Sequence, residues 1–427
     1  MRSRCAFPSA CLFLLMLAPR PVVSAELTMT EAIQQAQATH ASIDSARAQI
    51  QGAEGLQKQA ALRPNPTLNF QSENWRVTAP PSFVGARDLD LFAFVAQPLE
   101  TAGKRSRRMA VAAQTRRIAD LKSEAVMWSI RQRVKQDFLR ALLAQQQVQL
   151  LEENSRTFDQ IVEYHRNRVE LGAMAEADLI RVQLEADRFH VALRSAAMDS
   201  ERALVELLRS MGRPDPPNQI RLAEVPMQRP SDGGLGLDDI LEMAHRMRLE
   251  VQVHQSRVGQ AESQLDLQRA QAKPDWTAIF GYKRTTGLDT LIAGLSVPLP
   301  LFNRNQGNIA FEQSEVQRAR AELRLTLRDV DAEVRSALAG LRRRYQMLRE
   351  LQDGILARAE ESWRIAQAAY RVGGSDLLRL LDAQRARNEI QLLHARTQRE
   401  YQLSLVELES AVGAENLSLR EETLLEP

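Results

Sequence analysis

The sequence offers one pair of side chains with the spacing of a metal site. Glu242 and His245 stand three residues apart, as on the helices that hold carboxylate-bound di-iron centres. Such a centre needs a second Glu-x-x-His on another helix, and the sequence contains none. It also lacks HExxH, phosphate-loop and nucleophile-elbow motifs. We therefore interpret Glu242 and His245 as surface charges, and we predict no catalytic residues, no metal site and no cofactor.

The first 25 residues have the pattern of a cleaved export signal. Basic residues precede the apolar run Ala10–Ala18, and Val23–Ala25 supplies the small residues of a cleavage site. The only two cysteines, Cys5 and Cys11, lie in this segment. We therefore predict a signal peptide over residues 1–25 and a mature chain, beginning at Glu26, without thiols.

Charge and hydropathy exclude two further classes of protein. Removal of the signal takes away three Arg and no acidic residue, which leaves acids and bases nearly balanced. A balanced chain has no general attraction to nucleic acid, so no nucleic-acid partner is predicted. No run of about 18 apolar residues follows the signal, so no transmembrane helix is predicted. An exported chain of this kind either stays in the periplasm or crosses an outer membrane through β-strands.

The chain repeats one pattern twice. In each half a Gly turn stands between long helical runs, at Gly172 and again at Gly373. The run Lys104–Leu171 contains neither Gly nor Pro and predicts a helix about 100 Å long. The matching run is Asn308–Val372, which is interrupted only by Gly340 and Gly354. Its apolar residues at steps of three and four indicate coiled-coil packing.

Shorter elements accompany the two long helices. Half-length helices, two of which match one long helix when placed end to end, are predicted over Thr30–Leu62, Glu176–Met211, Asp238–Ala272 and Asp376–Val412. Strands are predicted over Thr67–Trp75, Asp88–Gln97, Trp276–Tyr282 and Thr290–Val297. Aromatic residues near the strand ends suit a transmembrane β-barrel with aromatic girdles. The alternative is a pair of solvent-facing hairpins that cap a helical rod.

The repeat also predicts boundaries and an oligomer. The first repeat covers 27–212, with a strand hairpin at 67–98 and a helical hairpin at 103–212. The second repeat covers 236–413, with a strand hairpin at 275–298 and a helical hairpin at 304–413. Irregular segments occupy 213–235 and 414–427. Four strands cannot close a barrel, and lipid does not tolerate open sheet edges. Two copies would give an eight-stranded barrel filled by side chains, and three would give twelve strands and room for a lumen.

Several motifs together resemble the TolC family of outer-membrane efflux proteins. They are the turn motifs Arg168–Ile180 and Tyr370–Leu381, the run Leu380–Arg385, and the segments Leu62–Leu68 and Gln97–Arg105 that flank strands. The resemblance covers nearly the whole mature chain. It implies a mainly α fold with a small β part, in which long helical hairpins of a homotrimer form a periplasmic tunnel joined to a twelve-stranded barrel in outer-membrane lipid. It further implies a passive export conduit of a Gram-negative outer membrane, docked onto a periplasmic adaptor (membrane fusion) protein and an inner-membrane pump.

A narrower resemblance concerns the cargo. The segment Val297–Ile309 resembles the cation-efflux branch of the family, the CzcC-like proteins that serve heavy-metal pumps of the resistance-nodulation-division (RND) type. This resemblance implies export of cobalt, zinc, cadmium, copper or nickel ions. The alternatives are a TolC-like channel for drugs, organic compounds or proteins, and a periplasmic coiled-coil adaptor or structural protein.

The family resemblance also assigns roles to residues near the two turns. The adaptor-contact tips would be Leu171, Gly172, Ala173, Val372, Gly373, Gly374 and Ser375. In the family, an Asp of the first inner helix meets a Tyr of the second hairpin to close the periplasmic gate, and the matching positions here are Asp178 and Tyr370, with Asp382 further along the bore. Arg379 stands where the best-known member has an acid, and could pair with Asp382 or Asp376. The alternative is that these are solvated charges at helix starts.

Overall fold

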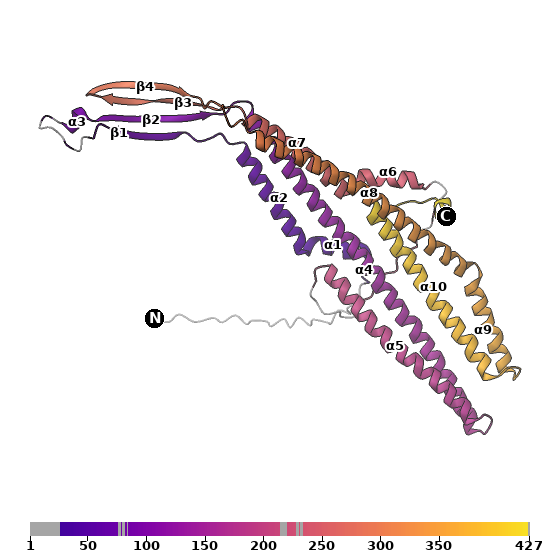
Figure 1. The fold of residues 1–427 in the computed structure, drawn as a ribbon. Coiled ribbons are helices and arrows are strands. Elements are labelled where there is room, and N and C mark those ends of the chain that lie inside the picture. Colours follow the sequence, from indigo (N-terminus) through magenta and orange to yellow (C-terminus); the bar gives the residue numbers. More distant parts are fainter. Residues whose placement is uncertain are drawn as a thin grey trace, which may run out of the picture.

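The protein is a long rod of helices with a small sheet at one end (Figure 1). The computed structural model describes residues 26–425 except 76–77, 79–81, 83, 214–219, 228–229 and 231–233. The predicted signal peptide, part of the segment 213–235 and the end of the tail lie outside the described residues.

The first repeat is built on α4 (Lys104–Glu170), which runs without a break from the sheet end of the rod to the opposite tip (Figure 1). This confirms the long helix that was predicted from a segment free of Gly and Pro. Three shorter helices pack along α4, namely α5 (Glu176–Ser210), α1 (Met29–Thr39) and α2 (Ala41–Ala60).

The second repeat has the same plan. Its elements are α6 (Leu237–Met247), α7 (Leu249–Gln271), α8 (Gln306–Glu350), the π-helical turn η1 (Leu351–Ile355), α9 (Leu356–Arg371) and α10 (Leu377–Val412), followed by the short α11 (Glu421–Leu425). The predicted run Asn308–Val372 is therefore not one helix. It breaks at Gly354, one of the two glycines that interrupt the run in the sequence, whereas Gly340 lies within α8. Gly354 leaves the helical region there, with φ 169° and ψ −22°, and this break separates α8 from α9.

Both predicted opening helices are also broken, and the breaks occupy equivalent positions. His40 separates α1 from α2 and Arg248 separates α6 from α7, each with an extended backbone (ψ 118° and 119°). Gly212 and Gly413 end α5 and α10 with φ of 72° and 78°. A Cβ on Gly212 would lie 3.3 Å from the Cα of His40, and one on Gly413 would lie 3.2 Å from the Cα of Arg248. The predictions of continuous helices over Thr30–Leu62 and Asp238–Ala272 are corrected accordingly.

The sheet contains four antiparallel strands in the order β1 (Thr67–Glu73), β2 (Asp90–Leu99), β3 (Trp276–Thr285) and β4 (Leu288–Ser296). The strand pairs of the two repeats thus join through β2 and β3, and β1 and β4 form the two edges. Strand β2 starts later than predicted because the short helix α3 (Gly85–Asp88) takes up the first residue of the predicted strand.

The two faces of the sheet differ in chemistry. In the register that pairs Phe70 with Ala93, Ala93 with Tyr282 and Tyr282 with Leu291, one face exposes large apolar side chains. They are Leu68, Phe70, Leu91, Val95, Leu99, Trp276, Phe280, Tyr282, Leu291 and Leu295. The other face mixes polar residues such as Asn69, Gln71 and Thr290 with aromatic ones, and Lys283 lies over the ring of Phe92 at 5.3 Å.

The two largest apolar clusters among the described residues are equivalent, one in each repeat. The first is centred on Ala32, Val134, Phe138 and Leu207, and the second on Ile240, Val334, Leu341 and Leu408. Both lie where the opening helix, the long helix and the returning helix of a repeat meet. None of the described helices combines the length and the apolar character that crossing a bilayer requires.

Candidate functional site: the hairpin tips and the strand–helix joint

The two hairpin tips have the same backbone. After α4, the N–H groups of Gly172 and Ala173 donate to the carbonyls of Val169 (2.9 Å) and Arg168 (2.8 Å). After α9, the N–H groups of Gly373 and Gly374 donate to the carbonyls of Tyr370 (3.1 Å) and Ala369 (2.9 Å). This pattern ends a helix with one residue of positive φ, which only glycine adopts readily.

The tip residues chosen from the sequence all lie at these two turns. Gly172 and Gly373 have φ of 69° and 77°, as predicted. The preceding residues, Leu171 and Val372, are both highly exposed and present one apolar side chain at each tip. Ala173 and Gly374 are exposed as well, and Ser375 is partly buried. The tips thus combine a rigid turn with an accessible apolar group.

Tyr370 is held by a buried histidine that the sequence analysis did not select. Its hydroxyl lies 2.7 Å from Nε2 of His165, and Nδ1 of His165 lies 2.7 Å from the carbonyl of Ile161. A carbonyl only accepts, so Nδ1 carries the proton, and in the neutral ring Nε2 accepts from the tyrosine hydroxyl. Burial is the main cause that raises the pKa of Tyr370. The pair fastens α9 to α4, and His165 is only 1 % exposed.

The other gate residues predicted from the family resemblance have local partners. Asp178 lies in the first turn of α5 and pairs with Arg181 at 3.6 Å. Asp382 pairs with Arg385 at 3.4 Å. Asp376 caps α10 by accepting the backbone N–H of Arg379 at 2.9 Å. The interaction suggested between Arg379 and Asp376 therefore involves the main chain of Arg379, and its side chain is exposed.

A buried ion pair joins the two helical hairpins. Glu185 of α5, whose side chain is 7 % exposed, accepts two hydrogen bonds from Arg385 of α10, one of them 3.0 Å long. The same carboxylate pairs with Arg188 of its own helix at 2.8 Å. The bond to Glu185 is the largest cause that raises the pKa of Arg385. Around this pair lies a small apolar cluster made of Phe158, Val182, Ala186, Leu377, Leu380 and Leu381.

Beside the Tyr370–His165 pair lies a cavity of about 430 Å³ between α4, α9 and α10. Tyr164, Trp363 and Gln384 contribute to its walls together with the pair itself. The side chains of these three helices therefore leave a void beside the Tyr370–His165 pair.

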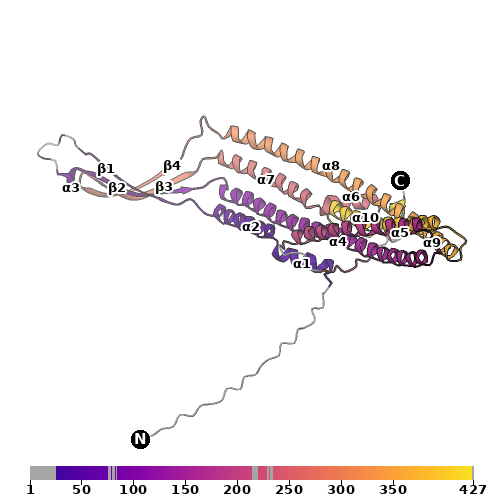
Figure 2. The same ribbon diagram turned by 90° about the horizontal axis from the view of Figure 1, so that it is seen from below.

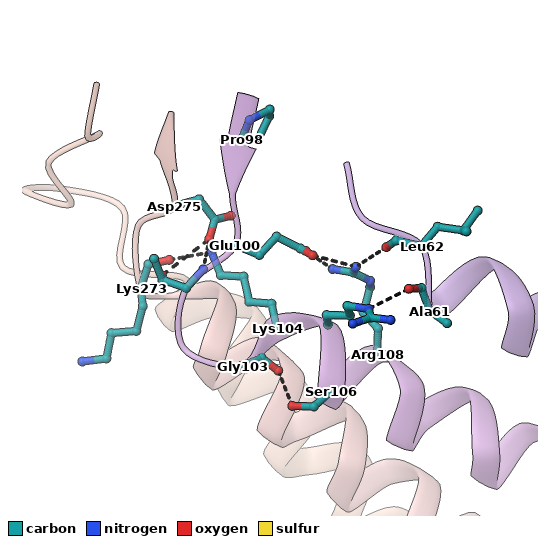
Figure 3. Close-up of polar contacts among 12 residues, drawn as sticks. Ala61, Leu62, Pro98, Glu100, Gly103, Lys104, Ser106, Arg108, Lys273 and Asp275 are labelled. Atoms are coloured by element: carbon teal, nitrogen blue, oxygen red, sulfur yellow. Dashed lines mark hydrogen bonds and ion pairs between the residues drawn. The ribbon is translucent and has the colours of Figure 1, made fainter. Parts of the chain in front are cut away.

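A second set of polar contacts lies at the other end of the long helices, where strands pass into helices (Figure 3). Lys104, the first residue of α4, is 7 % exposed. Its ammonium group donates to the carboxylate of Asp275 and to the carbonyl of Lys273, both at 2.7 Å. The backbone N–H of Thr101 donates to the same carboxylate at 2.8 Å. These contacts tie the start of α4 in the first repeat to the α7–β3 connection of the second.

Arginines of α4 complete this joint within the first repeat. Arg108 forms a two-bond ion pair with Glu100 and donates to the carbonyl of Leu62 at 3.2 Å (Figure 3). Arg105 donates to the carbonyl of Ala61 at 2.6 Å. The guanidinium groups thereby satisfy carbonyls at the C-terminal end of α2. The two sequence segments that flank the strands of the first repeat, 62–68 and 97–105, meet at this joint.

The comparison with protein families decides the classification. The family model described as "Outer membrane efflux protein" matches residues 32–213 and 240–414, which contain both repeats. The chain belongs to the outer membrane efflux protein family. The family resemblance predicted from the sequence is thereby confirmed.

This efflux protein is similar in sequence or in fold to several known proteins over most of its length. It is 24 % identical over 361 residues to the cobalt-zinc-cadmium resistance protein CzcC of Cupriavidus metallidurans, covering 84 % of this chain and 83 % of that one. Crystal structures of CusC match with a TM-score of 0.73 at 17 % identity, covering 91 % of this chain and 93 % of that one. The outer membrane protein VceC of Vibrio cholerae matches with a TM-score of 0.72 at 18 % identity, covering 90 % and 96 %. These structures confirm the predicted fold class, mainly helical with a small antiparallel sheet.

Proposed function

We propose that this efflux protein is the outer-membrane channel of a three-part export system and acts as a passive conduit. The observation that carries the proposal is the sheet, which exposes apolar side chains along one whole face at the end of the rod. A continuous apolar face of this size is unfavourable in water and suits contact with lipid hydrocarbon. The helical hairpins would then extend into the periplasm, with no chemical step of their own.

The four-stranded sheet can close into a barrel only if further copies of the chain add their strands. Strands β1 and β4 are open edges, and unpaired backbone groups are costly in lipid. Pairing of β4 with β1 of the next copy closes the barrel, and three copies give about twelve strands with a lumen. The same sheet that carries the membrane proposal thus also supports the proposed homotrimer.

Replacement of Phe70 by Arg is expected to prevent stable insertion, because Phe70 lies on the apolar face. A cationic side chain facing lipid costs about 2–4 kcal/mol in a barrel strand, and the trimer would carry the charge three times. Asn69→Arg is the matched control, since Asn69 neighbours Phe70 in β1 and lies on the opposite face. The measurement is the recovery of heat-modifiable, SDS-resistant trimers from outer membranes, followed by ion conductance in planar bilayers.

The control separates the channel from the competing class of protein. A periplasmic coiled-coil adaptor or structural protein would give neither resistant trimers nor conductance, with or without substitution. Equal losses for Phe70→Arg and Asn69→Arg would contradict the assignment of the apolar face to lipid.

The tips are proposed to dock onto a periplasmic adaptor protein that connects to an inner-membrane RND pump. The exposed apolar groups of Leu171 and Val372, each beside a rigid Gly turn, support this role because another helical hairpin could approach them closely. The residues behind the tips, Asp178, Tyr370, Arg379 and Asp382, are proposed to form the periplasmic gate. Opening would require the helices near the tips to separate.

The proposed cargo is heavy-metal cations. This proposal is supported by the similarity to the cobalt-zinc-cadmium resistance protein CzcC across most of both chains. The alternative is a channel for drugs, organic compounds or proteins. Deletion of the gene in its own host is expected to lower tolerance to some of cobalt, zinc, cadmium, copper and nickel, and to leave tolerance to dyes and detergents unchanged. Unchanged metal tolerance with increased dye sensitivity would exclude the metal assignment.

A further inference from the structure

We propose that the cavity of about 430 Å³ between α4, α9 and α10 is a binding site for a small aromatic anion. The cavity lies at the end of the rod opposite the sheet, where the two helical hairpins meet (Figure 2). Its volume falls in the range of sites that hold small molecules, about 300–1,000 Å³. None of the tip residues that are proposed to contact the adaptor lines it.

Three aromatic rings form the sides of the cavity. Tyr164 comes from α4, and Trp363 and Tyr370 come from α9, where a spacing of seven residues places them on one face of the helix. The guanidinium of Arg387 lies 4.2 Å from the centre of the Trp363 ring, and His165 holds Tyr370. Two of the rings are therefore held in place before a ligand arrives, which lowers the cost of binding a flat ring between them.

The third helix closes the inner side of the cavity with a largely apolar surface. Leu380 and Leu381 of α10 are 6 % and 3 % exposed. The only polar side chain that α10 contributes to the lining is that of Gln384, which is 2 % exposed and already donates to Oδ1 of Asn388 at 3.3 Å. The inner part of the cavity therefore favours hydrocarbon over charged or strongly hydrated groups.

The charge of the lining selects the sign of the ligand. Arg371 carries the one permanent charge in the lining, which contains neither Asp nor Glu. Beside it, Arg168 donates to the hydroxyl of Tyr164 at 3.2 Å and lies 5.8 Å from the centre of that ring. Within the described part of the chain, neither Arg371 nor Arg168 forms an ion pair. A carboxylate at the mouth of the cavity is therefore attracted, and an ammonium group is repelled.

A molecule in this site would contact both helical hairpins at once. Helix α4 belongs to the first hairpin, and α9 and α10 belong to the second. A ligand that binds only where the walls come together stabilises that arrangement by mass action. The ligand is therefore expected to hold the tip ends of the two hairpins together. This consequence rests on the gate proposed above, whereas the site itself does not.

Binding of 1-naphthoate to the purified full-length protein in detergent tests the site. Equilibrium dialysis measures the bound fraction, and dialysis against detergent alone corrects for partition into micelles. We expect saturable binding of one naphthoate per chain. The cation 1-naphthylmethylammonium reverses the charge, and cyclohexanecarboxylate keeps the charge without the aromatic ring. Both are expected to bind about tenfold more weakly or less.

Substitutions in the lining locate the bound naphthoate. Trp363→Leu is expected to weaken binding about threefold to tenfold, and Arg371→Gln about threefold to fivefold. Gln367→Trp fills the cavity from α9 and is expected to abolish binding. The matched control is Arg364→Gln, because Arg364 is exposed on the same helix, pairs with Glu361 at 2.6 Å and does not line the cavity. The helical circular dichroism signal of each variant is compared with that of the unmodified protein.

Equal binding by the unmodified protein and the folded Gln367→Trp variant would place naphthoate elsewhere, for example on the apolar face of the sheet, and would overturn the site. The absence of saturable binding would overturn it as well, and equal binding of 1-naphthylmethylammonium would overturn the anionic class of ligand. None of these results touches the channel assignment, which the trimer and conductance measurements test.

Naphthoate is also expected to lower the conductance of the unmodified channel in planar bilayers and to leave that of Gln367→Trp unchanged. Saturable binding without this difference would contradict the restraint on the hairpins.

Discussion

Replacement of Arg385 by Ala is expected to raise the resting conductance of the channel. Arg385 and Glu185 form the buried ion pair that joins α10 to α5, and its loss leaves these helices held mainly by the apolar cluster around Phe158. A hydrogen bond to a charged group contributes about 1.5–3 kcal/mol. We use the lower end because the Arg385 side chain is 38 % exposed. About 1.5 kcal/mol corresponds to roughly a tenfold increase in open probability in planar bilayers.

Arg188→Ala is the matched control for this prediction. Arg188 pairs with the same Glu185 carboxylate but lies on the same helix, so its loss removes a similar interaction without uncoupling the hairpins. We expect its conductance to stay near that of the wild type. Equal conductance for the two variants would show that the Glu185–Arg385 pair does not restrain the gate.

The second large effect is expected at the strand–helix joint. Lys104→Met removes the ammonium group that bonds both Asp275 and the carbonyl of Lys273, and leaves the Asp275 carboxylate without its cation. Breaking a buried pair costs about 3–5 kcal/mol, but the Asp275 side chain is 37 % exposed, so we expect about 2 kcal/mol. The measurement is the thermal unfolding of the helical circular dichroism signal. Lys273→Met is the control, because only the main chain of Lys273 contributes to the joint.

The stability that the strand–helix joint contributes is expected to depend on pH. Burial by itself raises the pKa of Asp275, but hydrogen bonds from Lys104 and Thr101 outweigh it, and the pKa is lowered overall. A lowered pKa in the folded state means that the carboxylate stabilises the joint at neutral pH and loses this contribution as pH falls through that value, below about 4. The difference in unfolding temperature between the wild type and Lys104→Met should therefore shrink in acid. A constant difference down to pH 2–3 would contradict the pairing.

Long-range periodicity and local turn chemistry were sufficient to predict much of the fold. The absence of Gly and Pro from Lys104 to Leu171 predicted α4, and the Gly turns predicted both tips, because a positive φ is a property of one residue and its neighbours. The breaks at His40 and Arg248 were missed because both residues are compatible with a helix. Contacts with the distant Gly212 and Gly413 accompany these breaks, and such contacts have no sequence signature.

The sequence predicted only those parts of the candidate site that are formed by residues close together in the chain. The tip residues followed from the repeated motif. The Glu185–Arg385 and His165–Tyr370 pairs each join residues about two hundred positions apart, which periodicity cannot relate. His165 did carry one signal that could have been used: it lies seven residues after the buried Phe158, on the stripe of α4 that faces inward.

The π-helical turn at Leu351–Ile355 has a mechanical consequence for the assembled tube. Helix α4 is an uninterrupted strut, whereas its counterpart is divided into α8 and α9 by a wide turn that bends more easily. A load applied at the distal end would therefore be borne by α4 and absorbed as bending near Gly354. In the proposed trimer, stiff and compliant helices would alternate around the circumference, so the mechanical properties of the wall would repeat three times.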